Sequence, residues 1–231
     1  MKAFPLAVRL TGAPCLCVGG GAVAARRVPR LVEAGATVML VTPSLDPTLR
    51  PLVEGGQCAH LARPFASGDC SGMFLVHVAT GDPEVDERAA AEARALGALV
   101  CVASNPALGN CQFMATLRRG PLVVALHTDG AAPAVTAALC RRIDAQLPER
   151  LGDILDSLAE IRGELRRGLG DPAERARRWT TVVECGALDR LLSLSDTTNL
   201  DEIRSILAGR GPSGLRSTDP TAPAAQSAAT S

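Results

Sequence analysis

Short apolar runs recur along the first half of the chain and alternate with segments in which apolar residues follow helical spacing. Each run is apolar throughout, which is typical of strands buried on both faces of a parallel sheet. The helical segments between the runs would cover these two faces, so the pattern predicts an α/β fold. We expect the strands at residues 14–19, 37–42, 73–80, 98–104 and 121–128.

Two helices are expected between these strands. In the first, Val28, Leu31 and Val32 share one face, and Gly35 follows as the C-terminal stop. The second starts after Asp82, which suits the N-cap, with proline at the first helical position. We expect the buried stripe of this second helix to consist of Val85, Ala89, Ala93 and Leu96.

The character of the chain changes after residue 130. Residues 131–148 predict a helix that begins at Pro133, residues 151–169 and 171–183 predict amphipathic helices, and shorter helices continue to about residue 209. The last residues, 211–231, are rich in Pro, Ala, Ser and Thr and have almost nothing to bury, so we expect a disordered tail.

A glycine-rich turn joins the first strand to the first helix in the sequence "CLCVGGGAVAARR". Gly19, Gly20, Gly21 and Ala24 fit the pattern G-x-G-x-x-A. The first glycine allows a tight turn, the next lets the backbone approach a pyrophosphate, and the small third residue lets the helix pack on the sheet. The amino end of the helix supplies free N–H groups for the anion. We therefore expect dinucleotide binding, and a merely tight turn is the alternative.

The end of the second strand lacks the acidic residue that usually binds the ribose hydroxyls of NAD. The strand ends in "VTPS", so Ser44 and backbone groups would take over that contact. The residues alone leave NAD and NADP both open. Thr80 ends the third run, "VHVAT", and should lie at the same edge of the sheet, where it could touch the cofactor.

Composition excludes several classes of protein. There is no tyrosine and Lys2 is the only lysine, so a Tyr-x-x-x-Lys dehydrogenase and a P-loop NTPase are both excluded. The formal net charge is zero, which argues against a nucleic-acid or anionic-membrane partner, and no apolar run is long enough for a membrane span. The eight cysteines form no C-x-x-C pair, and we interpret them as apolar core residues in a reducing cytoplasm.

Several segments together resemble the precorrin-2 dehydrogenase family, which stands alone or forms the N-terminal part of siroheme synthases. The segments are "FPLAVRLTGAPCLCVGGGAVAARR", "VATGDPEVD", "VCVASNP", "RRGPLVVALHTDGAAPAV" and "LPERLGDI". The resemblance covers roughly residues 4 to 185, with the segments in the same order and at similar spacing.

The resemblance implies a fold, an activity and a partner. In this family NAD⁺ accepts a hydride from precorrin-2, which gives sirohydrochlorin, and some members also insert Fe²⁺. The implied assembly is an intertwined homodimer. The implied parts are a Rossmann-like NAD-binding domain at residues 1–113, a dimerisation region at 114–148 and a helical C-terminal domain at 149–210, before the tail. The NAD-binding residues that the resemblance implies are Gly19, Gly21, Ala22, Val23, Pro43 and Ser44. The glycine pattern and the strand ends add Gly20 and Thr80 to these candidates.

The chain departs from the family at one position. The family has an aspartate after the strand at 100–103, its proposed general acid/base, where this chain has Ser104 followed by Asn105. A serine hydroxyl is a poor proton acceptor near neutral pH without an activating base. Oxidation depends first on how the substrate lies against the cofactor, so we expect dehydrogenation to survive better than iron chelation.

Other residues are candidates for the substrate site. His127, with Asp129 beside it in "ALHTDG", would lie on the same sheet edge as Ser104 and could replace the missing base or bind metal; a histidine at a strand end with no such role is the alternative. The tetrapyrrole carries many carboxylates, which arginine binds well. The candidate substrate-binding residues are Asn105, Arg118, Arg119 and Thr128, with Arg141 and Arg142 as further carboxylate-binding candidates.

The favoured reading is an NAD-dependent precorrin-2 dehydrogenase with weak or absent chelatase activity. The competing reading is a non-catalytic carrier or sensor that binds NAD or a tetrapyrrole, and Ser104 is the residue that keeps it open. A third reading, an unrelated NAD-binding regulatory subunit, does not account for the several matching segments.

Overall fold

The computed structural model describes residues 3–130, 132–187 and 199–210. It divides the chain into two compact units, residues 1–114 and 115–231. The tail expected to be disordered lies outside the described residues.

The first unit is built around a five-stranded sheet in which every neighbouring pair of strands is parallel. The strand order is β3-β2-β1-β4-β5. The bounds are β1 Pro14–Val18, β2 Thr37–Val41, β3 Cys58–Leu61, β4 Leu75–Val78 and β5 Leu99–Val102. This confirms the predicted α/β class and its first four strands. Strand β3 was not predicted, because its four residues alternate in burial and show no continuous apolar run.

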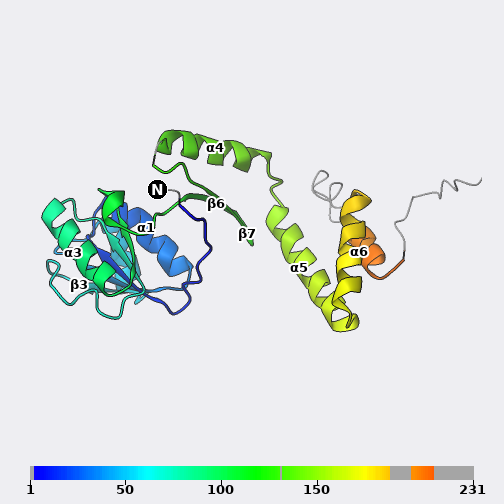
Figure 1. Ribbon diagram of the computed structural model, residues 1–231, viewed down its shortest axis with the longest axis horizontal. Helices are drawn as coiled ribbons and strands as arrows, with labels where there is room; N and C mark the ends of the chain where they lie inside the picture. Colours follow the sequence, from blue (N-terminus) through cyan, green and yellow to red (C-terminus); the bar gives the residue numbers. More distant parts are fainter. Residues whose placement is uncertain (1–2, 131, 188–198, 211–231) are drawn as a thin grey trace, which may run out of the picture. The chain divides into compact units, whose positions relative to one another are not determined.

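Helices cover both faces of this sheet. Helix α1 (Ala22–Glu33) and helix α3 (Pro83–Ala95) lie on opposite sides of the strands (Figure 1). One buried cluster joins α1 to one face and a second joins α3 to the other. Short elements complete the unit: the 3-10 helices η1 (Pro47–Leu49) and η2 (Pro106–Leu108), and helix α2 (Arg50–Glu54).

The predicted helix boundaries hold, but one buried residue was misplaced. Asp82 caps α3 by accepting hydrogen bonds from two backbone N–H groups, with Pro83 in the first turn. Leu96, expected to be buried, is 54% exposed, because α3 ends at Ala95 and the chain turns away there. The fully buried face of α3 instead consists of Asp86, Ala89, Ala90 and Ala93.

The second unit begins with a hairpin and continues as helices. Strand β6 (Ala115–Arg119) pairs antiparallel with β7 (Leu122–Leu126) in a separate two-stranded sheet. The expectation that residues 121–128 form a fifth parallel strand is therefore wrong. A two-residue loop at Gly120, whose φ is +53°, turns the chain back on itself, and this loop favours glycine at its first position.

The helices of the second unit follow their predicted ranges closely (Figure 1). Ile154, Ile161, Val182 and Ile203 form the centre of a small apolar core among the last three helices. Among the residues that the structure describes, no helix is long and apolar enough to cross a membrane. The bounds are α4 Pro133–Gln146, α5 Leu151–Gly168, α6 Pro172–Glu184 and α8 Asn199–Leu207.

Candidate functional site

The turn after β1 is wedged between the ends of the two neighbouring strands. Gly19 has a φ of +107°, and a Cβ atom there would lie 2.3 Å from the carbonyl oxygen of Ala79 at the end of β4. At Gly20, a Cβ atom would lie 2.4 Å from the carbonyl oxygen of Ser44 beyond β2. Neither position can carry a side chain without moving backbone, so both glycines are required by the turn itself.

Gly21 differs from its two neighbours because space is open beside it. It is exposed, and a Cβ atom would meet nothing within 4 Å. It is the N-cap residue of α1, where no side chain accepts from the backbone and no acidic residue occupies the first turn. The first N–H groups of the helix, at Ala22 and Val23, have no acceptor in the preceding turn. This open, positively polarised end of the helix fits a diphosphate and can hold the cofactor expected from the sequence.

The end of β2 lies directly beside this turn. The Thr42 hydroxyl donates to the Ser44 carbonyl oxygen at 2.8 Å, which fixes the segment that contains Pro43. The Asp46 N–H donates to the Gly20 carbonyl oxygen at 2.7 Å. The residues expected to contact the ribose of the cofactor therefore lie next to the glycine turn. Ser44 is also exposed to solvent, so a ligand can reach it.

Thr80 and Ser104 come from neighbouring strands and meet at one carboxylate. The Thr80 hydroxyl donates to Asp86 Oδ1 at 2.5 Å, and the Thr80 N–H donates to the same oxygen at 3.2 Å. The Ser104 hydroxyl donates to Asp86 Oδ2 at 2.6 Å. Asp86 is only 1% exposed, whereas Ser104 is exposed. The structure thus links the ends of β4 and β5 through a buried carboxylate.

The sequence reasoning missed Asp86 although a signal was present. Asp86 precedes Ala89, Ala90 and Ala93 by three, four and seven positions, so it shares their buried helix face. Asn105 was predicted as a substrate contact, but its side chain accepts from the Ala107 N–H at 3.1 Å and caps η2.

The remaining predicted site residues lie in the second unit. His127 follows β7, and its Nε2 atom lies 3.2 Å from Asp129 Oδ1. The expectation that His127 shares a sheet edge with Ser104 is wrong, because β7 belongs to the hairpin and not to the parallel sheet. The Thr128 hydroxyl lies 3.2 Å from that of Thr136 and accepts from the Ala132 N–H near the start of α4.

The two predicted arginines on β6 have different surroundings. Arg119 is half-buried and forms an ion pair with Asp144 of α4, with 2.8 Å between Nη2 and Oδ1. Arg118 is exposed, as are Arg141 and Arg142 of α4. Arg118 therefore offers its guanidinium group to an incoming anion more readily than Arg119 does.

His77 is a core histidine in the middle of the apolar strand β4. It is 1% exposed, and its Nδ1 lies 3.2 Å from the Cys101 carbonyl oxygen, so Nδ1 carries the hydrogen and donates it. Nε2 has no hydrogen-bond partner among the described residues. Burial, with a smaller contribution from Arg27, lowers the pKa of His77 to about 4.

This lowered pKa predicts a loss of stability in mild acid. In the unfolded chain the ring takes up a proton near its ordinary pKa of 6.5, whereas in the folded chain it stays neutral down to about 4. The contribution of neutral His77 to the free energy of unfolding is therefore fully present above pH 6.5 and is lost as the pH falls towards 4. Between pH 7.5 and 5 we expect the free energy of unfolding to fall by about 2 kcal/mol in urea titrations. The His77→Gln variant should lose most of this pH dependence of the free energy of unfolding. An equal pH dependence in both proteins would show that His77 is not its source.

The buried cysteines also behave as core residues. Burial, with a smaller contribution from Cys58, raises the pKa of the Cys17 thiol to about 12. Cys15 and Cys17 are both fully buried in the cluster beneath α1. In the part of the chain that the structure describes, no group of three or more His, Cys, Asp or Glu residues is arranged to hold a metal ion.

Comparisons with known proteins agree with this geometry. Residues 6–115 match the family described as "Putative NAD(P)-binding". The siroheme synthase of Methylobacillus flagellatus is 33% identical over 213 residues, which cover 91% of this chain and 45% of that protein. The siroheme synthase of Azotobacter vinelandii is 33% identical over 217 residues, which cover 93% of this chain and 46% of that protein.

A solved structure is similar to the fold as a whole. The protein titled "SirC, precorrin-2 dehydrogenase" matches with a TM-score of 0.75 and 24% identity, over 90% of this chain and 100% of that one. This likeness shows the fold. The chain spans somewhat less than half the length of the siroheme synthases that it matches. The chain is thus homologous to the siroheme synthases over nine tenths of its own length, and its residues 6–115 match a family of NAD(P)-binding domains.

Proposed function

We propose that this chain oxidises precorrin-2 to sirohydrochlorin, with NAD⁺ as the electron acceptor. The observation that carries the proposal is the open space at Gly21 over the amino end of α1, in a chain homologous to siroheme synthases. The reaction removes two hydrogen atoms from the macrocycle, one as a hydride and the other as a proton. In this proposal both transfers take place at the carboxyl edge of the parallel sheet.

The first unit holds the cofactor. The N–H groups of Ala22 and Val23 would bind the diphosphate, and Gly21 would leave room for it. Gly19 and Gly20 form the turn. Pro43 and Ser44 would hold the adenosine half of the cofactor, and Thr80 would hold the nicotinamide half. This assignment follows from the reversal of the strand order between β1 and β4, where dinucleotides bind in such sheets. When bound, NAD⁺ supplies the hydride acceptor.

Polar groups of each unit are the candidate substrate contacts. Ser104, accessible at the end of β5, would contact the macrocycle, with the Asn105 backbone beside it. Arg118 and Arg119 would bind propionate or acetate groups of the tetrapyrrole, and Thr128 would donate a hydrogen bond. We assign the reaction to the cytoplasm, where the buried free thiols would stay reduced.

A second copy of the chain is the proposed partner. Val123 on β7 and Val135 and Leu139 on α4 are 44%, 54% and 42% exposed. Large apolar side chains on both elements support a homodimer in which the hairpin and α4 are covered. The division of the second unit into a dimerisation region up to residue 148 and a helical domain beyond it is part of this proposal.

His127 is a candidate proton acceptor in addition to Ser104. Its ring lies 3.2 Å from the Asp129 carboxylate, which could orient it. If His127 accepts the proton, kcat of the His127→Ala variant falls about 10²-fold or more. An unchanged kcat in this variant would exclude His127 from proton transfer.

Iron chelation is expected to be weak or absent, because Ser104 supplies neither a carboxylate ligand nor a strong base. We expect the Ser104→Asp variant to raise Fe²⁺ insertion into sirohydrochlorin more than it raises oxidation. The new carboxylate would stand close to Asp86, whose Oδ2 lies 2.6 Å from the Ser104 hydroxyl. Siroheme absorbance measures insertion and NADH absorbance measures oxidation. A larger gain in oxidation than in insertion would contradict this account.

One assay separates the proposed enzyme from a carrier or sensor. Purified protein is incubated with precorrin-2 and NAD⁺, or NADP⁺ in a parallel sample, and NADH formation is followed together with the sirohydrochlorin spectrum. The enzyme produces reduced dinucleotide and sirohydrochlorin in equal amounts. Dinucleotide binding without turnover would favour the non-catalytic reading that the Ser104 position suggests.

A further inference from the structure

Asp86 is a buried carboxylate that cofactor binding does not use. It lies in the first turn of α3, is 1% exposed, and accepts three hydrogen bonds through its two oxygen atoms. Two of these come from Thr80 and the third comes from Ser104. The amino end of α3 favours negative charge at this place. The Asp86 carboxylate thus lies directly behind Thr80 and Ser104, the two residues expected to contact cofactor and substrate.

The hydrogen bond to Asp86 determines what Ser104 can do. A serine hydroxyl has one hydrogen and two lone pairs. Because the hydrogen points to Asp86 Oδ2 at 2.6 Å, only the lone pairs remain for a group on the accessible side. Ser104 therefore presents an acceptor to the substrate, with a carboxylate behind it that can take the hydroxyl hydrogen. This arrangement answers the objection that an isolated serine is a poor base.

The pair also lies at the place where the proposed reaction needs a proton acceptor. β1, β4 and β5 are neighbours in the sheet, so the glycine turn, Thr80 and Ser104 follow three successive strand ends. The Ala79 carbonyl oxygen, one residue before Thr80, is the atom that a Cβ atom at Gly19 would meet first. The accessible hydroxyl of Ser104 thus stands on the nicotinamide side of the strand-order reversal.

We propose that Ser104 accepts the proton released during precorrin-2 oxidation and passes its own hydrogen to Asp86. This inference rests on the proposed function. The hydride leaves the macrocycle for the nicotinamide dinucleotide. The second hydrogen leaves as a proton, its electron pair stays in the macrocycle as part of the new double bond, and a bond forms from that hydrogen to Ser104 Oγ. The former hydroxyl hydrogen moves to Asp86 Oδ2, and the resulting carboxylic acid releases it to water after turnover. Asp86 acts through Ser104 and is a positioning residue.

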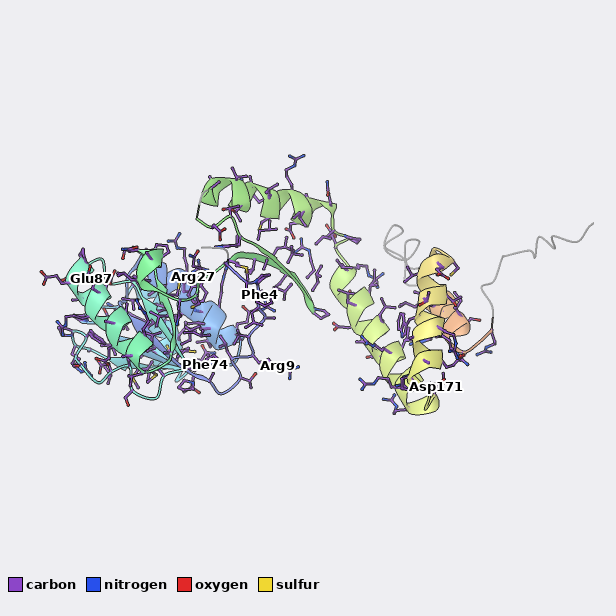
Figure 2. All side chains as sticks on the ribbon, in the orientation of Figure 1. Phe4, Arg9, Arg27, Phe74, Glu87 and Asp171 are labelled. Carbon is purple, nitrogen blue, oxygen red and sulfur yellow. The ribbon has the colours of Figure 1, made fainter. Side chains whose placement is uncertain are left out.

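The first test is Asp86→Asn, which keeps the size of the side chain and removes the carboxylate. We expect kcat to fall about 10²-fold at pH 7, with KM for precorrin-2 and the Kd for NADH within about threefold of their original values. The matched control is Glu87→Gln on the same helix, which removes the same charge from an exposed side chain that points away from the sheet (Figure 2). Its kcat should stay unchanged. An unchanged kcat in Asp86→Asn would overturn the inference.

A second pair of variants separates proton transfer from a structural role. Adding Ser104→Asp to Asp86→Asn returns a carboxylate to the edge of the sheet, and we expect kcat to recover at least about tenfold. A purely structural Asp86 would not be rescued in this way. Ser104→Ala changes an exposed residue and should fold even if Asp86→Asn does not. It should lower kcat about as much as Asp86→Asn, and combining the two should cause little further loss.

The outcomes distinguish this inference from the function on which it rests. If the unmodified protein oxidises precorrin-2 and Ser104→Ala leaves kcat unchanged, the relay is wrong and the proposed function stands. If the unmodified protein shows no oxidation, both proposals fail together. NADH fluorescence titration and thermal unfolding of each variant show that cofactor binding and folding are intact.

Discussion

The Gly19→Ala variant is expected to lose at least about 3 kcal/mol of stability in the first unit. The φ of +107° belongs to a region that L-residues rarely adopt, and the new Cβ atom would lie 2.3 Å from the Ala79 carbonyl oxygen. That oxygen is backbone at the end of β4, so relief requires the turn and the strand to separate. Urea unfolding followed by circular dichroism measures the loss.

The control for this variant is Gly21→Ala, two residues further on. Gly21 has a φ of −85°, and a Cβ atom there meets nothing within 4 Å. We expect its unfolding midpoint to stay close to that of the unmodified protein. Equal destabilisation by the two substitutions would show that the turn is not held in the way described.

The Gly21→Asp variant is expected to weaken NADH binding at least about 100-fold, which corresponds to about 2.7 kcal/mol. The new carboxylate would occupy the open space over the amino end of α1 and repel the diphosphate. The same substitution should leave the fold intact or stabilise it, because aspartate is a preferred N-cap residue and Gly21 already has the extended N-cap backbone. Affinity and stability are thus expected to move in opposite directions.

NADH fluorescence titration and thermal unfolding measure the two effects. Gly21→Ser is the matched variant, because it also caps the helix but adds no charge. It should gain similar stability with a much smaller loss of affinity. If Gly21→Asp binds NADH as tightly as the unmodified protein, the dinucleotide does not lie over the amino end of α1.

The sequence predicted the parts of the fold that depend on local patterns. Continuous apolar runs identified four strands of the parallel sheet, and Asp82 and Gly35 marked helix boundaries that the structure confirms. The fifth predicted strand failed because β7 is as apolar as a buried parallel strand. Its true partner was signalled only by the Gly-Pro pair at 120 and 121, which forms the hairpin loop.

The candidate site could be predicted only where a local sequence pattern marks a residue. The glycine turn and Thr80 could be named as candidates, because each follows an apolar strand. The hydrogen bonds that join Thr80 and Ser104 to Asp86 could not be predicted, because they connect residues up to 18 positions apart across two strand ends. Only the assembled sheet shows that Ser104 has a buried carboxylate directly behind it.

Isothermal titration calorimetry of the unmodified protein with NAD⁺ tests the central claim most directly. The account predicts saturable binding of one dinucleotide per chain, which is lost in Gly21→Asp and retained in Gly21→Ser. No measurable heat with either NAD⁺ or NADH, in a protein that is folded by circular dichroism, would contradict it.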